Sequence, residues 1–232
     1  TGQEEDELHV AMLRGVVARG HTTVLFKPHP ASPVRATGAL AEAAQSLGAR
    51  LLVIDDPVPA EAWCAATRPA LIVGCFSTAL STAVRYYGVP AAAVGTRDLL
   101  AKLAPYQNSN RVPVTIIDTM LPHLSEDGTL SAPVLTDAAE LSRLLTAVAY
   151  AMRAGSLPER RAEAVAYLTG HAGGPMARYF KRRRLTTLGL PGGLSPATRS
   201  LLATALPPRS RRRRLAVGVF DRAGLRAAAG DG

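Results

Sequence analysis

Along the first 150 residues, short apolar runs alternate with longer segments in which apolar residues recur at every third or fourth position. In residues 4–19, for example, Leu8, Met12 and Val16 fall at helical spacing, and Gly20 ends the pattern. The predicted strands are 22–26, 51–54, 70–73, 90–94 and 114–117. The predicted helices are 4–19, 34–47, 59–67, 77–87 and 137–153.

Apolar strands separated by helices of this length are typical of an α/β protein with a parallel sheet covered on both faces. The predicted fold class is therefore a Rossmann-like, doubly wound parallel sheet. In such sheets, ligands bind at the carboxyl ends of the strands. We therefore expect the chemistry to lie just after residues 26, 54, 74 and 95.

Composition and charge divide the 232-residue chain in two. The hydrophobic fraction of 47% and the charged fraction of 19% exclude wholesale disorder. Residues 1–150 carry 11 basic and 14 acidic residues, whereas residues 151–232 carry 16 and 4. We predict a nucleotide-sugar-binding domain over residues 1–155 and a basic tail over 156–232, partly helical and partly disordered, with arginine clusters at 182–184 and 211–214.

The first candidate motif, Lys27-Pro28-His29-Pro30, directly follows the predicted strand 22–26. Because Lys27 and His29 each precede a proline, both should be held extended and point to one side of the chain. A cation and an imidazole held together suit an anionic phosphate, and the imidazole could protonate a leaving phosphate oxygen. The alternative is a turn with an exposed lysine and a hydrogen-bonded histidine.

The second candidate motif, Gly74-Cys75-Phe76-Ser77-Thr78-Ala79-Leu80, follows the predicted strand 70–73. Gly74 should permit a sharp turn, and Ser77 or Thr78 occupies the helix N-cap position. Free backbone N–H groups, two hydroxyls and the helix dipole would together form an anion site. The alternative is a plain helix cap without a ligand. Both motifs lie at carboxyl ends of strands, so together they predict a nucleotide-phosphate site.

The two motifs, about 45 residues apart, resemble those of the bacterial α-2,8-polysialyltransferase family and, more broadly, of bacterial sialyltransferases with the GT-B fold. The resemblance covers roughly residues 1–120 and implies a C-terminal, nucleotide-binding half that uses no metal or other cofactor. It implies that His29 binds the leaving phosphate as a catalytic residue, and that Ser77 and Thr78 bind the same phosphate. The expected reaction transfers sialic acid from CMP-sialic acid to a hydroxyl of a glycan acceptor. Lys27, Pro30, Gly74, Ser77 and Thr78 are the predicted substrate-binding residues, Lys27 from its charge alone.

One departure from the family concerns its acidic general-base motif, which precedes the His-Pro pair. The 28 residues before His29 contain no such motif, and Glu126-Asp127-Gly128 is predicted to be a surface turn. The chain is therefore expected to be a donor-binding fragment without its N-terminal half. Two alternatives stay open: a related transferase with a CDP- or UDP-activated donor, and a non-catalytic module that binds a nucleotide or a polyanion.

Two further polar segments have two interpretations each, and three single residues have one. Asp55-Asp56 could face ribose hydroxyls or form a turn, and the polar loop 106–111 could line the cleft or lie at the surface. Trp63 is expected to pack, and Cys64 and Cys75 to be small buried hydrophobes.

The sequence also bears on location and partners. It has no run of about 18 apolar residues, an acidic start where a signal peptide would be basic, and only two cysteines, so we expect a cytoplasmic protein. The basic tail could be solvated, or could contact an anionic membrane from the cytoplasmic side or a polyanionic glycan. Nucleic acid is the least supported partner, because the tail has few aromatic residues for base stacking.

Overall fold

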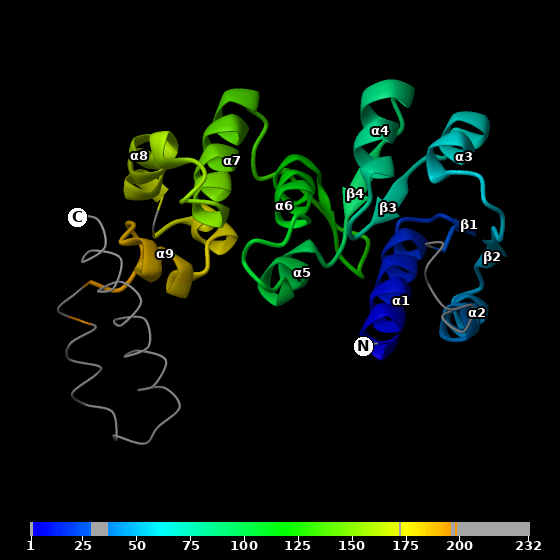
Figure 1. Ribbon diagram of the computed structural model, residues 1–232. Coiled ribbons are helices and arrows are strands. Elements are labelled where there is room, and N and C mark those ends of the chain that lie inside the picture. The colour runs from blue at the N-terminus through cyan, green and yellow to red at the C-terminus, as the bar shows by residue number, and fades with distance from the viewer. Residues whose placement is uncertain (1, 29–36, 172, 196–197, 199–232) are drawn as a thin grey trace, which may run out of the picture. The chain divides into compact units, whose positions relative to one another are not determined.

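A computed structural model describes residues 2–28, 37–171, 173–195 and 198. His29, Pro30 and the arginine cluster 211–214 lie outside the described residues. The chain divides into two compact units, coloured along the sequence in Figure 1. The first comprises Thr1–Leu103 and Ser109–Leu141, and the second comprises Ala104–Asn108 and Ser142–Gly232.

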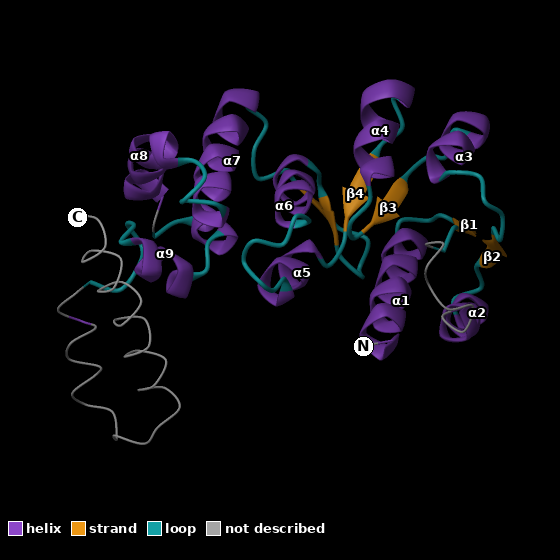
Figure 2. Ribbon diagram, in the orientation of Figure 1, coloured by secondary structure: helices purple, strands orange, loops and turns teal. Residues whose placement is uncertain are grey.

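In the first unit, strands and helices alternate along the chain, as Figure 2 shows by colour. The helices are α1 (Gly2–Ala18), α2 (Thr37–Ser46), α3 (Ala60–Thr67), α4 (Thr78–Tyr87), α5 (Thr96–Lys102) and α6 (Arg111–Met120). The strands are β1 (Thr23–Phe26), β2 (Arg50–Val53), β3 (Ile72–Gly74), β4 (Ala91–Ala93), β5 (His123–Leu124) and β6 (Leu130–Ser131). The mixed α/β class predicted from the hydrophobic pattern is confirmed.

The described strands form two hydrogen-bonded sheets where the sequence predicted one. β1 and β2 pair in parallel, from Thr23 opposite Arg50 to Phe26 opposite Val53. The second sheet has the order β3-β4-β5-β6, with β3, β4 and β5 parallel and β6 antiparallel to β5. No hydrogen-bonded ladder joins the two sheets among the described residues. The Rossmann-like topology therefore stays a prediction.

Helices cover both faces of the second sheet. Ala92 of β4 packs in one hydrophobic cluster with Leu13 of α1 and Leu40 of α2. Ala91 and Ala93 point the other way, into a cluster completed by residues of α4 and α6, namely Leu80, Ile117 and Leu121. Since all three alanines of β4 are buried, this strand has apolar surroundings on both faces, as expected for a parallel strand inside a layered α/β unit.

The strand predicted at 114–117 is wrong, because these residues belong to helix α6. Val-Thr-Ile-Ile favours a strand by its β-branched side chains. The wider pattern is helical, however: Val114, Ile117 and Asp118 are buried at helical spacing. Tertiary packing outweighs the local preference, and the next strand of the sheet is β5, where His123 lies opposite Ala93.

Over its described residues, the regular elements of the second unit are all helices. Its elements are η2 (Pro158–Arg160), α8 (Arg161–His171), η3 (Pro175–Tyr179) and α9 (Arg182–Leu188), preceded by α7 (Ala138–Met152), within which the unit boundary falls. Buried apolar residues occur along it, among them Val148, Leu168, Tyr179 and Leu185.

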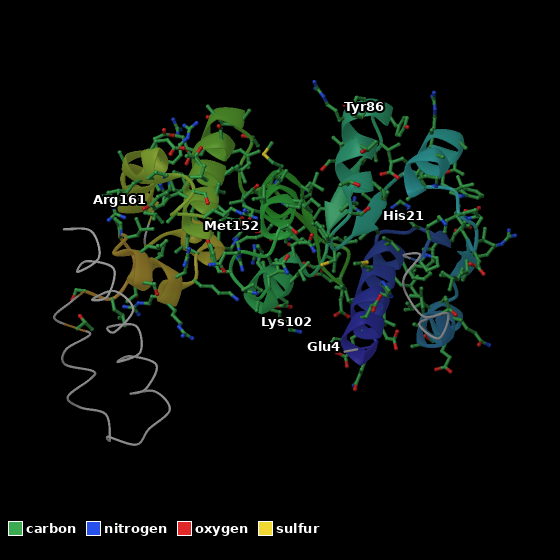
Figure 3. The ribbon with its side chains drawn as sticks, in the orientation of Figure 1. Glu4, His21, Tyr86, Lys102, Met152 and Arg161 are labelled. Atoms are coloured by element: carbon green, nitrogen blue, oxygen red, sulfur yellow. The ribbon has the colours of Figure 1, made fainter. Side chains whose placement is uncertain are left out.

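Two arginines of the second unit bind backbone carbonyls. Arg184 donates from Nε to the carbonyl of Ala151 at 2.6 Å, in the last turn of α7. Arg161, labelled in Figure 3, donates to the hydroxyl of Tyr150 and to the carbonyl of Leu188. Part of the region expected to be a basic tail is thus packed structure, in which some arginines hold helices together.

Candidate functional site

The Ser/Thr motif joins β3 to α4 as a capped helix start. Ser77 has extended backbone angles, φ −156° and ψ 136°, and its Oγ accepts a hydrogen bond from Ala79 N at 3.2 Å. This is the N-cap geometry predicted from the sequence. Thr78, the first helical residue, is exposed, whereas Ser77 is half-buried. The hydroxyl hydrogen of Ser77 and the Thr78 hydroxyl are therefore placed where a ligand at the helix N-terminus could accept from them.

Gly74 closes β3 without an unusual backbone conformation. Its φ lies outside the positive range, and a Cβ there would lie in ordinary contact with Leu80, at 3.5 Å. Neither backbone strain nor crowding therefore requires a glycine at this position, and the predicted part of Gly74 in substrate binding stays a prediction.

Lys27 lies directly after β1 and forms an ion pair with the loop after β2. Its Nζ is 3.1 Å from Asp56 Oδ1 and also donates to the backbone carbonyl of Asp56. The same carboxylate accepts from Trp63 Nε1, at 3.2 and 3.3 Å, and from Val58 N at 3.0 Å. The turn reading of Asp55-Asp56 is confirmed by the Val58 contact. The polar role of Trp63 was not foreseen, since only the fold brings residues 27, 56 and 63 together.

The Asp56 carboxylate is ionised in this arrangement. Partial burial disfavours its charge, but hydrogen bonds from Lys27 and Trp63 outweigh that effect and lower the pKa of Asp56 below its usual value. Among the described residues, the hydrogen bonds and the ion pair of Lys27 go to Asp56 and not to Ser77 or Thr78. The structure thus places Lys27 and the Ser/Thr motif at carboxyl ends of parallel strands, and it shows that Lys27 has a protein partner.

A buried polar cluster lies at the carboxyl end of β4, where sequence reasoning expected chemistry but named no residue. Thr96 donates from Oγ1 to Asp118 Oδ1 at 2.5 Å, and both side chains are fully buried. His123 Nε2 lies 2.8 Å from the Asp118 backbone carbonyl and 3.6 Å from Oδ1. A carbonyl can only accept, so Nε2 carries the proton and Nδ1 is the other available nitrogen.

This polar cluster and the Ser/Thr motif lie at the same level of the second sheet, on paired positions of β3, β4 and β5. Gly74 lies opposite Ala93, and Ala93 lies opposite His123. Two strand spacings separate Gly74 from His123, or roughly 10 Å. The only sequence signal for the cluster was the position of Thr96 just after a predicted strand.

Cys75, in the Ser/Thr motif, is a protonated thiol. Desolvation by burial, together with the negative charges of Asp98 and Asp118, raises its pKa to about 11. A nucleophilic cysteine requires the opposite, a thiolate near neutral pH. Of the two cysteines predicted to be small buried hydrophobes, Cys64 is buried and Cys75 is only half-buried.

His9 of α1 packs beside the end of β1. Its ring meets that of Phe26 edge to face, with centroids 4.9 Å apart. Burial lowers the pKa of His9, although Glu5 and Asp6 oppose the shift. Within the described part of the chain, its Nδ1 is buried without a hydrogen-bond partner. His9 is thus an imidazole beside Phe26, the residue before Lys27.

The acidic sequence 126–128 is a turn, as predicted. It connects β5 to β6, with Gly128 at φ +85° and Thr129 N donating to Asp127 Oδ1 at 2.9 Å. Glu126 is exposed and pairs with Arg14 at 2.9 Å. This turn supplies no buried general base. Over the described residues, no three side chains of His, Cys, Asp or Glu are grouped to hold a metal ion.

The layered α/β unit, with hydroxyls at the N-terminus of α4 and a lysine at the end of β1, is of a class that commonly binds phosphorylated ligands. Residues 1–96 match the model of one family, described as alpha-2,8-polysialyltransferase (POLYST). The family resemblance seen in the sequence is therefore confirmed for this part of the chain, which contains both motifs. Neither the comparison with curated proteins nor that with solved structures found a match.

The match covers residues 1–96 of the 232, and the similarity of this part is to a family of glycosyltransferases of the sialyltransferase type. As for the membrane, the helices in the described ranges are all too short or too polar to cross it.

Proposed function

We propose that the first unit binds CMP-sialic acid and acts as the donor half of a sialyltransferase that transfers sialic acid to a glycan hydroxyl. The observation that carries this proposal is the family match over residues 1–96, which includes the capped start of α4. The unit would correspond to the nucleotide-binding half of a GT-B enzyme, with the acceptor held by the other half.

In this proposal the α4 N-terminus binds the donor phosphate. Ser77 Oγ accepts from Ala79 N and can donate its own hydrogen to a phosphate oxygen, while Thr78 donates a second hydrogen bond. The positive end of the α4 dipole stabilises the same charge. Gly74 is the first residue of this phosphate-binding loop, and Lys27 supplies a cation from the end of β1.

His29 is the proposed catalytic residue, followed by Pro30 in the His-Pro pair. An acceptor hydroxyl oxygen attacks the anomeric carbon of the sialyl group, and the bond to the CMP phosphate breaks with its electron pair on phosphate. A protonated imidazole stabilises or protonates that leaving oxygen. Because the family's acidic base motif is not found before His29, removal of the acceptor proton falls to a group outside residues 1–28.

Two other functions remain in competition. A CDP- or UDP-activated donor would use similar phosphate contacts and differ in the base it carries. A nucleotide- or polyanion-binding module would bind without transfer. Contact with an anionic membrane or a polyanion is proposed for the arginines of the second unit, among them the exposed Arg182 and Arg183. A cytoplasmic location is part of the same proposal.

The test is a calorimetric titration of the chain with CMP, with CDP and UDP as controls. We expect selective binding of CMP that weakens in His29→Ala. A double variant, Ser77→Ala with Thr78→Val, should lose more affinity for CMP than for cytidine, because the hydroxyls contact phosphate and not the base. Equal losses for CMP and cytidine would contradict the phosphate contact. Preference for CDP or UDP would favour the second function.

A further inference from the structure

At the end of β1, Lys27 pairs with the Asp56 carboxylate, which also accepts hydrogen bonds from two other groups. Asp56 Oδ1 accepts from Lys27 Nζ and from Val58 N, and both carboxylate oxygens accept from Trp63 Nε1. The side chains of Lys27 and Asp56 are only 18% and 31% exposed. Solvent therefore screens this ion pair less than it screens a pair at the surface.

The pairing changes what Lys27 offers to a ligand. An ammonium group has three N–H donors. The Lys27 ammonium contacts two oxygens of Asp56, one of the carboxylate and the other of the backbone carbonyl. With Asp56 ionised, the pair is electrically neutral. An anion arriving at the end of β1 meets a lysine whose charge is already compensated.

We propose that Lys27, Asp56 and Trp63 form an anion-responsive clamp, in which a phosphate group competes with the Asp56 carboxylate for the Lys27 ammonium. This inference rests on the proposed phosphate site and adds a role for Asp56, which sets how much charge Lys27 gives to the ligand. Asp56 touches no substrate in this scheme, so it is a positioning residue. Because Asp56 competes for Lys27, it lowers the affinity of the site for any phosphate. Ligands that also contact other residues of the site are then favoured over phosphate alone.

Trp63 makes the clamp observable. It is the single tryptophan of the sequence, and its indole N–H binds the carboxylate that Lys27 would leave. When Lys27 moves to a phosphate, the charge next to the indole becomes unpaired, and the tryptophan emission should change. The emission therefore reports Lys27 transfer separately from the heat of binding.

The experiment titrates the full chain with inorganic phosphate and with CMP, and it follows both calorimetry and tryptophan emission. The variants are Lys27→Met, Asp56→Asn and the two combined. Asparagine keeps the shape of the side chain and an oxygen that can accept from Trp63. Lys102→Met is the matched control, because Lys102 also pairs with a carboxylate, that of Glu4 at 2.7 Å, on the same unit. Thermal unfolding confirms that each variant is folded.

We expect Asp56→Asn to bind inorganic phosphate several-fold more tightly than the unchanged chain, and Lys102→Met to bind like it. Lys27→Met should bind more weakly and lose the emission change. In the Lys27→Met background, Asp56→Asn should give no gain, since the coupling between the two residues is what the double-mutant cycle measures.

Three results would overturn the clamp. These are unchanged or weaker phosphate binding in Asp56→Asn, a gain that persists without Lys27, and no phosphate binding by any variant. Failure of the proposed function looks different, because the clamp pattern with phosphate would then occur without selectivity for CMP over CDP and UDP. Selective CMP binding that depends on Ser77 and Thr78 but not on Asp56 would refute the clamp alone.

Discussion

Gly15 in α1 gives the sharpest test of how this unit packs. A Cβ at Gly15 would lie 2.7 Å from the backbone oxygen of Ser125 and 2.9 Å from the side chain of Leu124, at the end of β5. The backbone oxygen cannot rotate away, so Gly15→Ala forces α1 and the β5–β6 hairpin apart. Overpacking of this kind costs about 1–3 kcal/mol, and alanine returns roughly 0.5–1 kcal/mol through its helix preference. The expected net loss is about 0–2.5 kcal/mol of unfolding free energy, against a gain for the control variant described next.

Gly38 in α2 is the matched control. Nothing lies within 4 Å of a Cβ at this position. Gly38→Ala should therefore stabilise the unit, by about 0.4–1 kcal/mol. Urea unfolding followed by the emission of Trp63, which lies in the first unit, measures both variants. If Gly15→Ala is as stable as Gly38→Ala, α1 does not approach the hairpin as described, and the reasoning fails.

Three further predictions test other contacts. Thr96→Val removes the hydrogen bond to the buried carboxylate of Asp118 and should lower the free energy of unfolding by about 1–3 kcal/mol in the same urea assay. A loss below about 0.5 kcal/mol would contradict a stabilising role for this hydrogen bond. Arg184→Gln removes the contacts to the last turn of α7 and should cost about 1–2 kcal/mol, seen as a lower Tm; an unchanged Tm would show that the capping is not stabilising. The hydrogen bond from Lys102 lowers the pKa of Glu4 to about 2, so its stabilisation is present above pH 4.5 and is lost as pH falls toward 2. Lys102→Met should raise that pKa in an NMR titration, and an unchanged value would refute the pairing. Figure 3 labels both partners.

Local sequence signals predicted much of the first unit. The helix period of α1, the capping role of Ser77 and the turn at 126–128 each depend on residues close together in the chain, so propensity and turn chemistry suffice. The strand predicted at 114–117 was wrong because that prediction also relied on local preference alone. Its β-branched residues favour a strand locally, whereas burial of one face fixes it as part of α6.

The sequence by itself determined the α/β class, the two motifs at strand ends and the family resemblance, because these depend on short-range order and on residue identity. Only the tertiary structure decided which partners those residues have. Lys27 pairs with Asp56, 29 residues further along the chain, and Thr96 bonds Asp118, 22 residues further along. Asp56 in turn accepts from Trp63. Such contacts follow from how strands and helices stack, and their energies depend on burial, which no local pattern specifies.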